Sequence, residues 1–249
     1  MPARRYLKPP ITEAVIECRF GSALPQSALA RFVRNVMTEY PAAEETYEIS
    51  VQLQVVAVGQ KSEAKAEQSF AGYKLTGGDA ADLILLGFDR IATIRLAPYD
   101  GWENFVARAK SNYDNLRKIA GYRKITRVAT RYINRLDIPS NGAPVIRTEE
   151  YLMVDPRVPD IIPSINTFST AFAGVIPEIE GQVIVRTGTM QSPLIDHASL
   201  LLDIDLFKEQ NLPTRDQDIW EILSFLRVQK NELFEAFITD RSRELFDRA

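Results

Sequence analysis

Three arginines recur at every fourth position in one stretch of the chain, at Arg127, Arg131 and Arg135. Residues 124–139 alternate polar and apolar side chains, which is typical of a β-strand with one buried face. The three guanidiniums and Asp137 would then share the polar face of that strand. A guanidinium makes bidentate contacts with carboxylates and phosphates, so the stretch is suited to holding anions.

Two carboxylates, Glu13 and Glu17, have the same four-residue spacing in a second alternating segment, 11–20. Side chains spaced in this way recur about 13 Å apart along one side of a strand. If the two strands are neighbours, their charges could form cross-strand ion pairs, each contributing about 0.2 to 1 kcal/mol. Two interpretations follow. The arginines and glutamates form a structural ladder, or their face binds an anionic small molecule or a partner protein.

Tyr99 and Trp102 flank Gly101 in a turn-like segment. Such aromatic side chains could form a shelf at the mouth of a ligand pocket, beside the ligand-binding set of arginines and glutamates. The alternative is that they belong to the hydrophobic core at the start of a helix.

A second set of carboxylates offers a different chemistry. Asp203 and Asp205 lie on one face of a predicted strand, and together with Asp137 or Glu17 they could hold Mg²⁺. A metal-dependent hydrolase or nuclease is therefore the alternative function. The aspartates could equally neutralise the arginines.

Other catalytic signatures are missing from the sequence. The only histidine, His197, has no accompanying nucleophile motif, and the only cysteine, Cys18, falls on the apolar face of its strand. Gly77-Gly78 lacks the Lys-Ser/Thr of a phosphate-binding loop. These absences favour a binding or regulatory protein without a cofactor over an enzyme.

Composition limits the setting of the protein. The 33 acidic and 30 basic residues of the 249 nearly cancel, so the long-range field that attracts nucleic acid is not expected. A single cysteine requires no oxidising compartment, and no apolar run is long enough for a signal sequence or a membrane helix. We therefore expect a cytoplasmic protein without a membrane partner.

Apolar periodicity predicts an α+β fold with a mostly antiparallel sheet and its helices packed on one face. The predicted strands are 11–20, 47–58, 69–75, 82–87, 91–96, 127–138, 165–175, 182–190 and 199–207. The predicted helices are 24–40, 102–121, 148–154 and 216–237. Capping boxes are expected at Asp100 with Glu103 and at Thr214 with Gln217, and Thr239 should cap a terminal turn.

The order of elements repeats in outline, which predicts two related α+β halves, 1–123 and 124–249, within one compact unit. On the last helix, Trp220 and Phe225 lie off the main stripe formed by Ile219, Leu223, Leu226, Leu233 and Phe237. This helix could thus be buried on a second side, either within the fold or in a homo-oligomer.

Four segments together resemble a family of sporadically distributed, uncharacterised bacterial proteins of about this length. They are Pro9–Phe20, Arg95–Phe105, Arg131–Pro139 and Phe237–Asp240. The resemblance implies a single family-length unit in the bacterial cytoplasm. A patchy distribution would fit mobile defence or accessory genes. The family carries no activity and no catalytic residues that could be transferred to this chain.

Overall fold

The computed structural model describes residues 4, 6–54, 63–140, 147–154, 156–159, 161 and 165–247. At 51–54 and 63–65 only the backbone is described. Within these ranges the chain forms nine strands and four α-helices, together with two short 3₁₀ turns. In chain order the elements are β1 (Ile11–Phe20), α1 (Gln26–Val36), β2 (Ala42–Gln54), β3 (Glu63–Thr76), β4 (Asp82–Gly87), β5 (Arg90–Leu96), α2 (Trp102–Ala120), β6 (Ile125–Pro139), η1 (Thr148–Glu150), β7 (Ser169–Ile176), η2 (Pro177–Ile179), β8 (Gly181–Met190), β9 (His197–Lys208), α3 (Asp216–Phe237) and α4 (Asp240–Asp247).

All the described strands join one open sheet with the order β2-β3-β4-β5-β1-β6-β9-β8-β7, and every neighbouring pair is antiparallel. β1 and β6 lie side by side near the middle, with Val15 opposite Arg131. β6 in turn pairs with β9, where Arg131 lies opposite Asp205. The alternating segments 11–20 and 124–139 are thus central neighbours, as a ladder between them requires.

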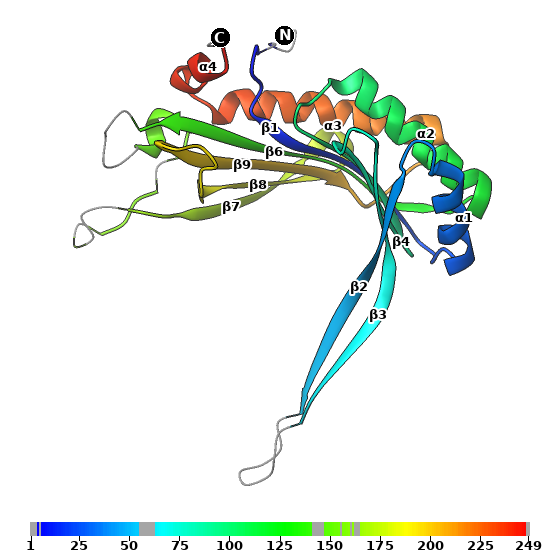
Figure 1. Ribbon diagram of the computed structural model, residues 1–249. Helices are drawn as coiled ribbons and strands as arrows, with labels where there is room; N and C mark the ends of the chain where they lie inside the picture. Colours follow the sequence, from blue (N-terminus) through cyan, green and yellow to red (C-terminus); the bar gives the residue numbers. More distant parts are fainter. Residues whose placement is uncertain are drawn as a thin grey trace.

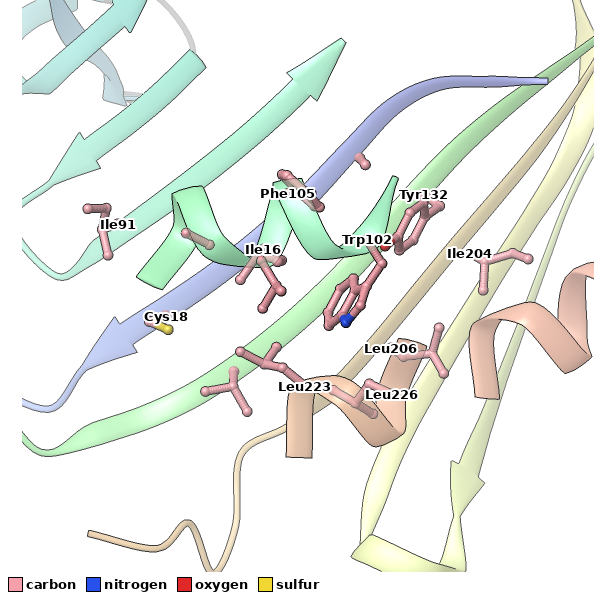
Figure 2. Packing of buried hydrophobic residues seen from close by; sticks show 14 of the residues in the cluster. Ile16, Cys18, Ile91, Trp102, Phe105, Tyr132, Ile204, Leu206, Leu223 and Leu226 are labelled. Carbon is pink, nitrogen blue, oxygen red and sulfur yellow. The ribbon is translucent and has the colours of Figure 1, made fainter. Parts of the chain in front are cut away.

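The helices α1, α2 and α3 cover one face of the sheet (Figure 1). The strand residues on that face are apolar and buried, and they pack against the apolar stripes of the helices. Figure 2 shows side chains from β1, α2, β6, β9 and α3 meeting in one cluster, with Ile16, Phe105, Tyr132, Ile204 and Leu223 among its members. None of the described helices is long and apolar enough to cross a membrane.

The opposite face of the sheet, which we call the open face, is not covered by these helices (Figure 1). From this side the β2–β3 hairpin projects away from the rest of the molecule. The hairpin leaves the sheet at a register shift after Thr46, opposite Gly72. Gly72 has a φ of 150°, and a Cβ atom there would overlap the carbonyl oxygen of Leu86. Only glycine therefore fits this close approach of β3 to β4.

The α+β class, the antiparallel pairing and most of the predicted elements are confirmed. β1 begins and ends where its alternation does, and the arginine-bearing segment is a central strand. The predicted strand 47–58 begins earlier, at Ala42, and its last residues, 55–58, lie outside the described residues. The predicted helix 148–154 is wrong, because only the 3₁₀ turn η1 forms there.

Both predicted capping boxes are wrong. α2 is capped by Gly101 and α3 by Arg215, and neither residue caps its helix through a side-chain hydrogen bond. Asp100 instead binds Arg108 through both carboxylate oxygens, because the guanidinium is a stronger partner than a backbone N–H. Thr239 does cap α4, since its hydroxyl accepts a hydrogen bond of 3.4 Å from the Ser242 N–H.

The second buried side of α3 is explained within the fold. Trp220 packs edge-to-face on Tyr113 of α2, with 5.9 Å between ring centroids. Phe225 is partly buried against the same core. A partner subunit is therefore not needed to cover these two side chains.

Candidate functional site

The open face carries the arginines singled out in the sequence, and each has a carboxylate partner. Arg127 donates to Glu17 at 2.5 Å and lies 3.1 Å from Glu209. Its guanidinium also stacks over the ring of Phe207, 4.3 Å from the centroid. Glu17 accepts a second hydrogen bond, of 2.8 Å, from Arg19. β1 and β6 are therefore joined by a cross-strand ion pair of the expected kind.

The second arginine makes the strongest contact on this face. Arg131 donates two parallel hydrogen bonds, of 2.8 and 2.7 Å, to the carboxylate of Asp203. Arg186 of β8 adds a third at 3.3 Å. The Asp203 side chain is only 2% exposed, whereas both arginine side chains are 41% exposed. The hydrogen bonds raise the pKa of Arg131 further above its already high ordinary value.

The last part of the row is also paired. Arg135 donates to Asp137 at 2.9 and 3.1 Å, and Asp137 accepts a hydrogen bond of 2.5 Å from Ser199. Glu13 is partly buried on the same face of β1. Each of the three guanidiniums in the row thus meets a carboxylate of the protein, but only Arg127 and Glu17 form a pair of the predicted kind between β1 and β6, since Arg131 binds Asp203 of β9 and Arg135 binds Asp137 of its own strand.

The candidate metal ligands are spread along two strands. Asp203 pairs with Ile133 of β6, whereas Asp137 pairs with Ser199. An offset of four residues places these two carboxylates about 13 Å apart along the strands. Burial raises the pKa of Asp205, which lies 3.6 Å from Arg127. Among the residues that the structure describes, no group of three or more acidic, histidine or cysteine side chains is arranged to hold a metal ion.

His197 and Cys18 remain outside any reactive group of residues. The Nδ1 atom of His197 lies 2.8 Å from the carbonyl oxygen of Ile195, in the loop that enters β9. Cys18 is buried in the core, and burial raises the pKa of its thiol to about 12. A thiol with this pKa is not a nucleophile at neutral pH.

A different group of polar residues surrounds a cavity on the helical side of the sheet. The cavity has a volume of about 770 Å³, within the range of small-molecule sites. Four parts of the chain form its walls: the segment leading into β1, the first turn of α2, the middle of β6 and the last turns of α3. Pro9, Glu103 and Asn104 are exposed on its rim, so the cavity opens to solvent.

The wall formed by α2 is held in place by ion pairs. The buried guanidinium of Arg95 in β5 lies 2.6 Å from Asp79, 3.2 Å from Asp82 and 3.8 Å from Asp100. Its Nε also donates to the carbonyl oxygen of Pro98 at 3.1 Å. Gly101 follows with a φ of 99°, a conformation that favours glycine. These contacts fix the turn that carries Tyr99 and Trp102 into the cavity wall.

Two tyrosine hydroxyls meet at the cavity, 3.3 Å apart, one from Tyr99 and one from Tyr132 of β6. Their rings pack edge-to-face, with 5.8 Å between centroids. Burial raises the pKa of Tyr99 to about 12 and that of Tyr132 well above its ordinary value. Both hydroxyls are therefore protonated at neutral pH and can donate hydrogen bonds.

The most unusual group in the cavity is the amine of Lys230 on α3. This lysine is only 8% exposed, and its Nζ lies 4.0 Å from the centroid of the Tyr132 ring. Among the described residues, it makes no hydrogen bond and no ion pair. Burial, followed by the nearby charge of Arg227, lowers the pKa of Lys230 to about 7. A buried lysine without a carboxylate partner is uncommon in a stable fold.

Arg227 lies one turn before Lys230 on the same helix and lines the same cavity. It also makes no hydrogen bond or ion pair within the described part of the chain. The nearest acid on α3, Glu235, accepts hydrogen bonds of 2.6 Å from Tyr6 and 3.0 Å from Arg243. The cavity thus holds two cations whose charges are not matched by a contacting carboxylate.

Of the residues that the sequence suggested for ligand binding, the aromatic pair Tyr99 and Trp102 lines this cavity, whereas the arginines and glutamates do not. Lys230 was missed, although α3 carries a signal for it. The buried stripe of the helix passes through Leu226, Lys230 and Phe234 at four-residue spacing, so a lysine interrupts an apolar row. A charge at such a position requires either a partner or a ligand.

No protein-family model matches the chain, and a search of curated proteins also finds no match. The resemblance described above therefore stays a prediction. Three of its four segments nevertheless meet at the cavity, through Pro9 and Pro10, through Tyr99 to Asn104, and through Tyr132 and Asn134.

Proposed function

We propose that this protein binds a small organic anion in the cavity between the first turn of α2 and the last turns of α3. The observation that carries the proposal is the buried amine of Lys230, which lines the cavity without a protein hydrogen bond or ion pair among the described residues. A bound carboxylate or phosphate would provide the missing partner for Lys230 and Arg227.

The other cavity walls support an organic ligand. Trp102 and Phe234 are buried aromatic side chains, and Tyr99 adds a third ring. The two tyrosine hydroxyls and the Asn231 amide supply polar contacts at defined positions. Apolar walls with few polar groups are typical of sites that bind metabolite-sized molecules.

The proposal keeps the binding function expected from the sequence but moves its site. On the open face, a ligand would have to compete with carboxylates that already hold the guanidiniums in place. In the cavity, Lys230 and Arg227 have no contacting carboxylate among the described residues, although Asp100, Glu103 and Glu235 also line it. No observation favours the hydrolase alternative.

Calorimetric titration with benzoate tests the proposal, with benzyl alcohol as the neutral molecule of similar shape. We expect benzoate to bind and benzyl alcohol to bind weakly or not at all. At pH 6, where the Lys230 amine is protonated, Lys230→Met and Arg227→Met should each weaken benzoate binding about tenfold or more, because each removes a charged hydrogen-bond donor. Arg186→Gln on the open face is the matched control and should bind benzoate like the unmodified protein.

Two results would contradict the proposal. One is equal binding of benzoate by the unmodified protein and by both cavity variants. The other is a loss of binding in Arg186→Gln, since that would place the anion on the open face.

We also propose that the halves 1–123 and 124–249 arose by duplication. The pairing pattern supports this. β1 pairs with β5, the last strand before α2, and β6 pairs with β9, the last strand before α3. Superposition of β1, β5 and α2 on β6, β9 and α3 tests it. Strands that match only in reversed direction would rule the duplication out.

A further inference from the structure

We infer that Lys230 is a nucleophilic amine that forms a reversible imine with the carbonyl group of a 2-oxo acid bound in the cavity. The inference rests on the proposed function, because the carboxylate of this ligand is the anion that the cavity binds. It adds a covalent step and a substrate class to simple anion binding.

The surroundings of the amine suit this reaction. An imine forms only from an unprotonated amine, and a buried lysine beside another cation loses its proton readily. The amine of Lys230 lies near the charges of Arg227 and Glu235 on α3 and over the ring of Tyr132 on β6. The other titratable groups that line the cavity are Arg4, Tyr6, Tyr99, Asp100 and Glu103. Glu235 is held by Tyr6 and Arg243, so it does not form an ion pair with the amine.

The positions of the two cations define the ligand. Arg227 and Lys230 are three residues apart on one helix, which places their Cβ atoms about 5 to 6 Å from each other. A guanidinium there can hold a carboxylate while the amine reaches the adjacent carbon atom. A 2-oxo acid has its carbonyl carbon bonded directly to the carboxylate. An isolated aldehyde would leave Arg227 without an anion.

The two tyrosines can take part in the proton transfers of imine formation. The amine nitrogen adds to the carbonyl carbon, the electron pair of the C=O bond moves to oxygen, and a proton passes from the nitrogen to this oxygen to give a carbinolamine. The hydroxyl then takes a further proton and leaves as water, the C=N bond forms, and the nitrogen releases its second proton, so the two hydrogens of the amine end up in the water. Tyr132 and Tyr99, whose hydroxyls lie 3.3 Å apart, remain protonated and can donate to the departing oxygen. Addition of water reverses the reaction, and no oxidant or reductant is required.

Borohydride trapping tests the inference directly. The full chain is incubated with phenylglyoxylate at pH 8 and treated with borohydride, which reduces an imine to a stable secondary amine. We expect a mass gain equal to the probe minus one oxygen atom, located on the peptide that contains Lys230. Mandelate, which has the same anion and ring but no carbonyl group, should bind without any mass gain.

Two variants separate Lys230 from other lysines. Lys230→Met should lose the label, whereas Lys208→Met should retain it. Lys208 is the matched control because it is also buried, but its amine is bound to the carbonyl oxygen of Ile179 and lies 3.5 Å from Glu180. Peptide mapping of the unmodified protein gives the same answer without relying on a variant.

The outcomes also separate this inference from the proposed function. If mandelate binds in the cavity and phenylglyoxylate leaves no label on Lys230, the imine is ruled out and anion binding stands. If neither molecule binds, anion binding itself fails. A label spread over exposed lysines and unchanged in Lys230→Met would also overturn the inference.

Discussion

The row of arginines on the open face and the two cations Lys230 and Arg227 of the cavity differ in their partners. On the open face, Arg131 donates two hydrogen bonds to Asp203, and Arg127 and Arg135 are also paired with carboxylates. Behind the sheet, Lys230 and Arg227 line a cavity without such partners in the described chain. Cations matched by protein carboxylates contribute to structure, whereas unmatched ones are available to a ligand. The row of arginines that dominates the sequence is therefore the structural part.

The two buried lysines repeat the contrast. Lys208 lies at the end of β9 and donates to the Ile179 carbonyl oxygen near Glu180. Lys230 is buried to a similar extent, and the described residues offer its amine the face of the Tyr132 ring but no hydrogen bond or ion pair. Burial of a lysine alone therefore does not indicate a binding site. A buried lysine that lines a cavity and lacks a protein partner in the described chain is the better indicator.

The largest effect is expected in the core below the cavity. Phe105 is fully buried and Trp102 is nearly so, and replacing either by alanine should cost about 3 to 5 kcal/mol in the free energy of unfolding. Only Trp102 lines the cavity. Trp102→Ala should therefore also weaken benzoate binding, while Phe105→Ala should leave it unchanged. Urea unfolding measures the loss of stability, and calorimetry measures benzoate binding. Losses of stability under about 1 kcal/mol would show that these two side chains do not form a buried stripe on α2.

The next effect tests the structural role of the open face. Arg131→Met leaves the buried carboxylate of Asp203 with one arginine among the described residues, Arg186 at 3.3 Å. We expect a loss of about 2 to 3 kcal/mol, below the usual cost of breaking a buried pair because the Arg131 side chain is partly exposed. Urea unfolding measures the loss. Benzoate binding by the folded variant should be unaffected, and a variant of unchanged stability would contradict the ladder.

Lys230→Met should raise the free energy of unfolding, whereas the variants above lower it. Methionine keeps the length of the side chain and removes a buried charge, so we expect a gain of about 1 to 2 kcal/mol near pH 7. The pKa of Lys230 is about 7 in the folded protein, against 10.5 as its ordinary value. Between these values the unfolded chain binds more protons, so stability should rise with pH. This rise should be smaller in Lys230→Met.

Thermal unfolding from pH 6 to pH 10 provides the measurement. The tyrosines near Lys230 titrate above this range, because burial raises the pKa of each. Arg227→Met serves as the control, since it retains the lysine and should keep a pH-dependent rise. Identical pH profiles for Lys230→Met and the unmodified protein would show that burial does not lower the pKa of the amine.

Much of the fold could be predicted from the sequence because its signals are local. Alternation in 11–20 and 124–139 identified both central strands, and the three-to-four-residue stripe from Trp102 to Leu116 identified α2. Capping failed at Asp100, because Arg108, further along α2, and Arg95 of β5 both approach its carboxylate. Which of several donors a carboxylate binds depends on side-chain geometry, and the spacing of the capping box does not show it.

The cavity could not be predicted for a related reason. Its walls come from residues 6–11, 99–104, 132–134 and 227–235, and only the fold brings these segments together. The arginine row stands out because regular spacing is visible within one strand. Lys230 is a single charge in the buried stripe of α3, and its significance depends on which face of the helix meets the sheet.

The smallest effect concerns the tyrosine pair. Tyr99→Phe removes one hydroxyl of the pair and leaves the Tyr132 hydroxyl, which is fully buried, without this partner at 3.3 Å. We expect a loss of about 0.5 to 1.5 kcal/mol in the free energy of unfolding, since a neutral hydrogen bond contributes about that much. Benzoate should still bind, because both cations remain.

The rate of labelling by phenylglyoxylate tests whether Tyr99 takes part in proton transfer. If the tyrosines donate to the departing oxygen, Tyr99→Phe should slow imine formation more than it weakens mandelate binding. The rate of label appearance after timed borohydride additions measures the difference. Equal reduction of rate and affinity would assign Tyr99 a role in shaping the cavity and none in proton transfer.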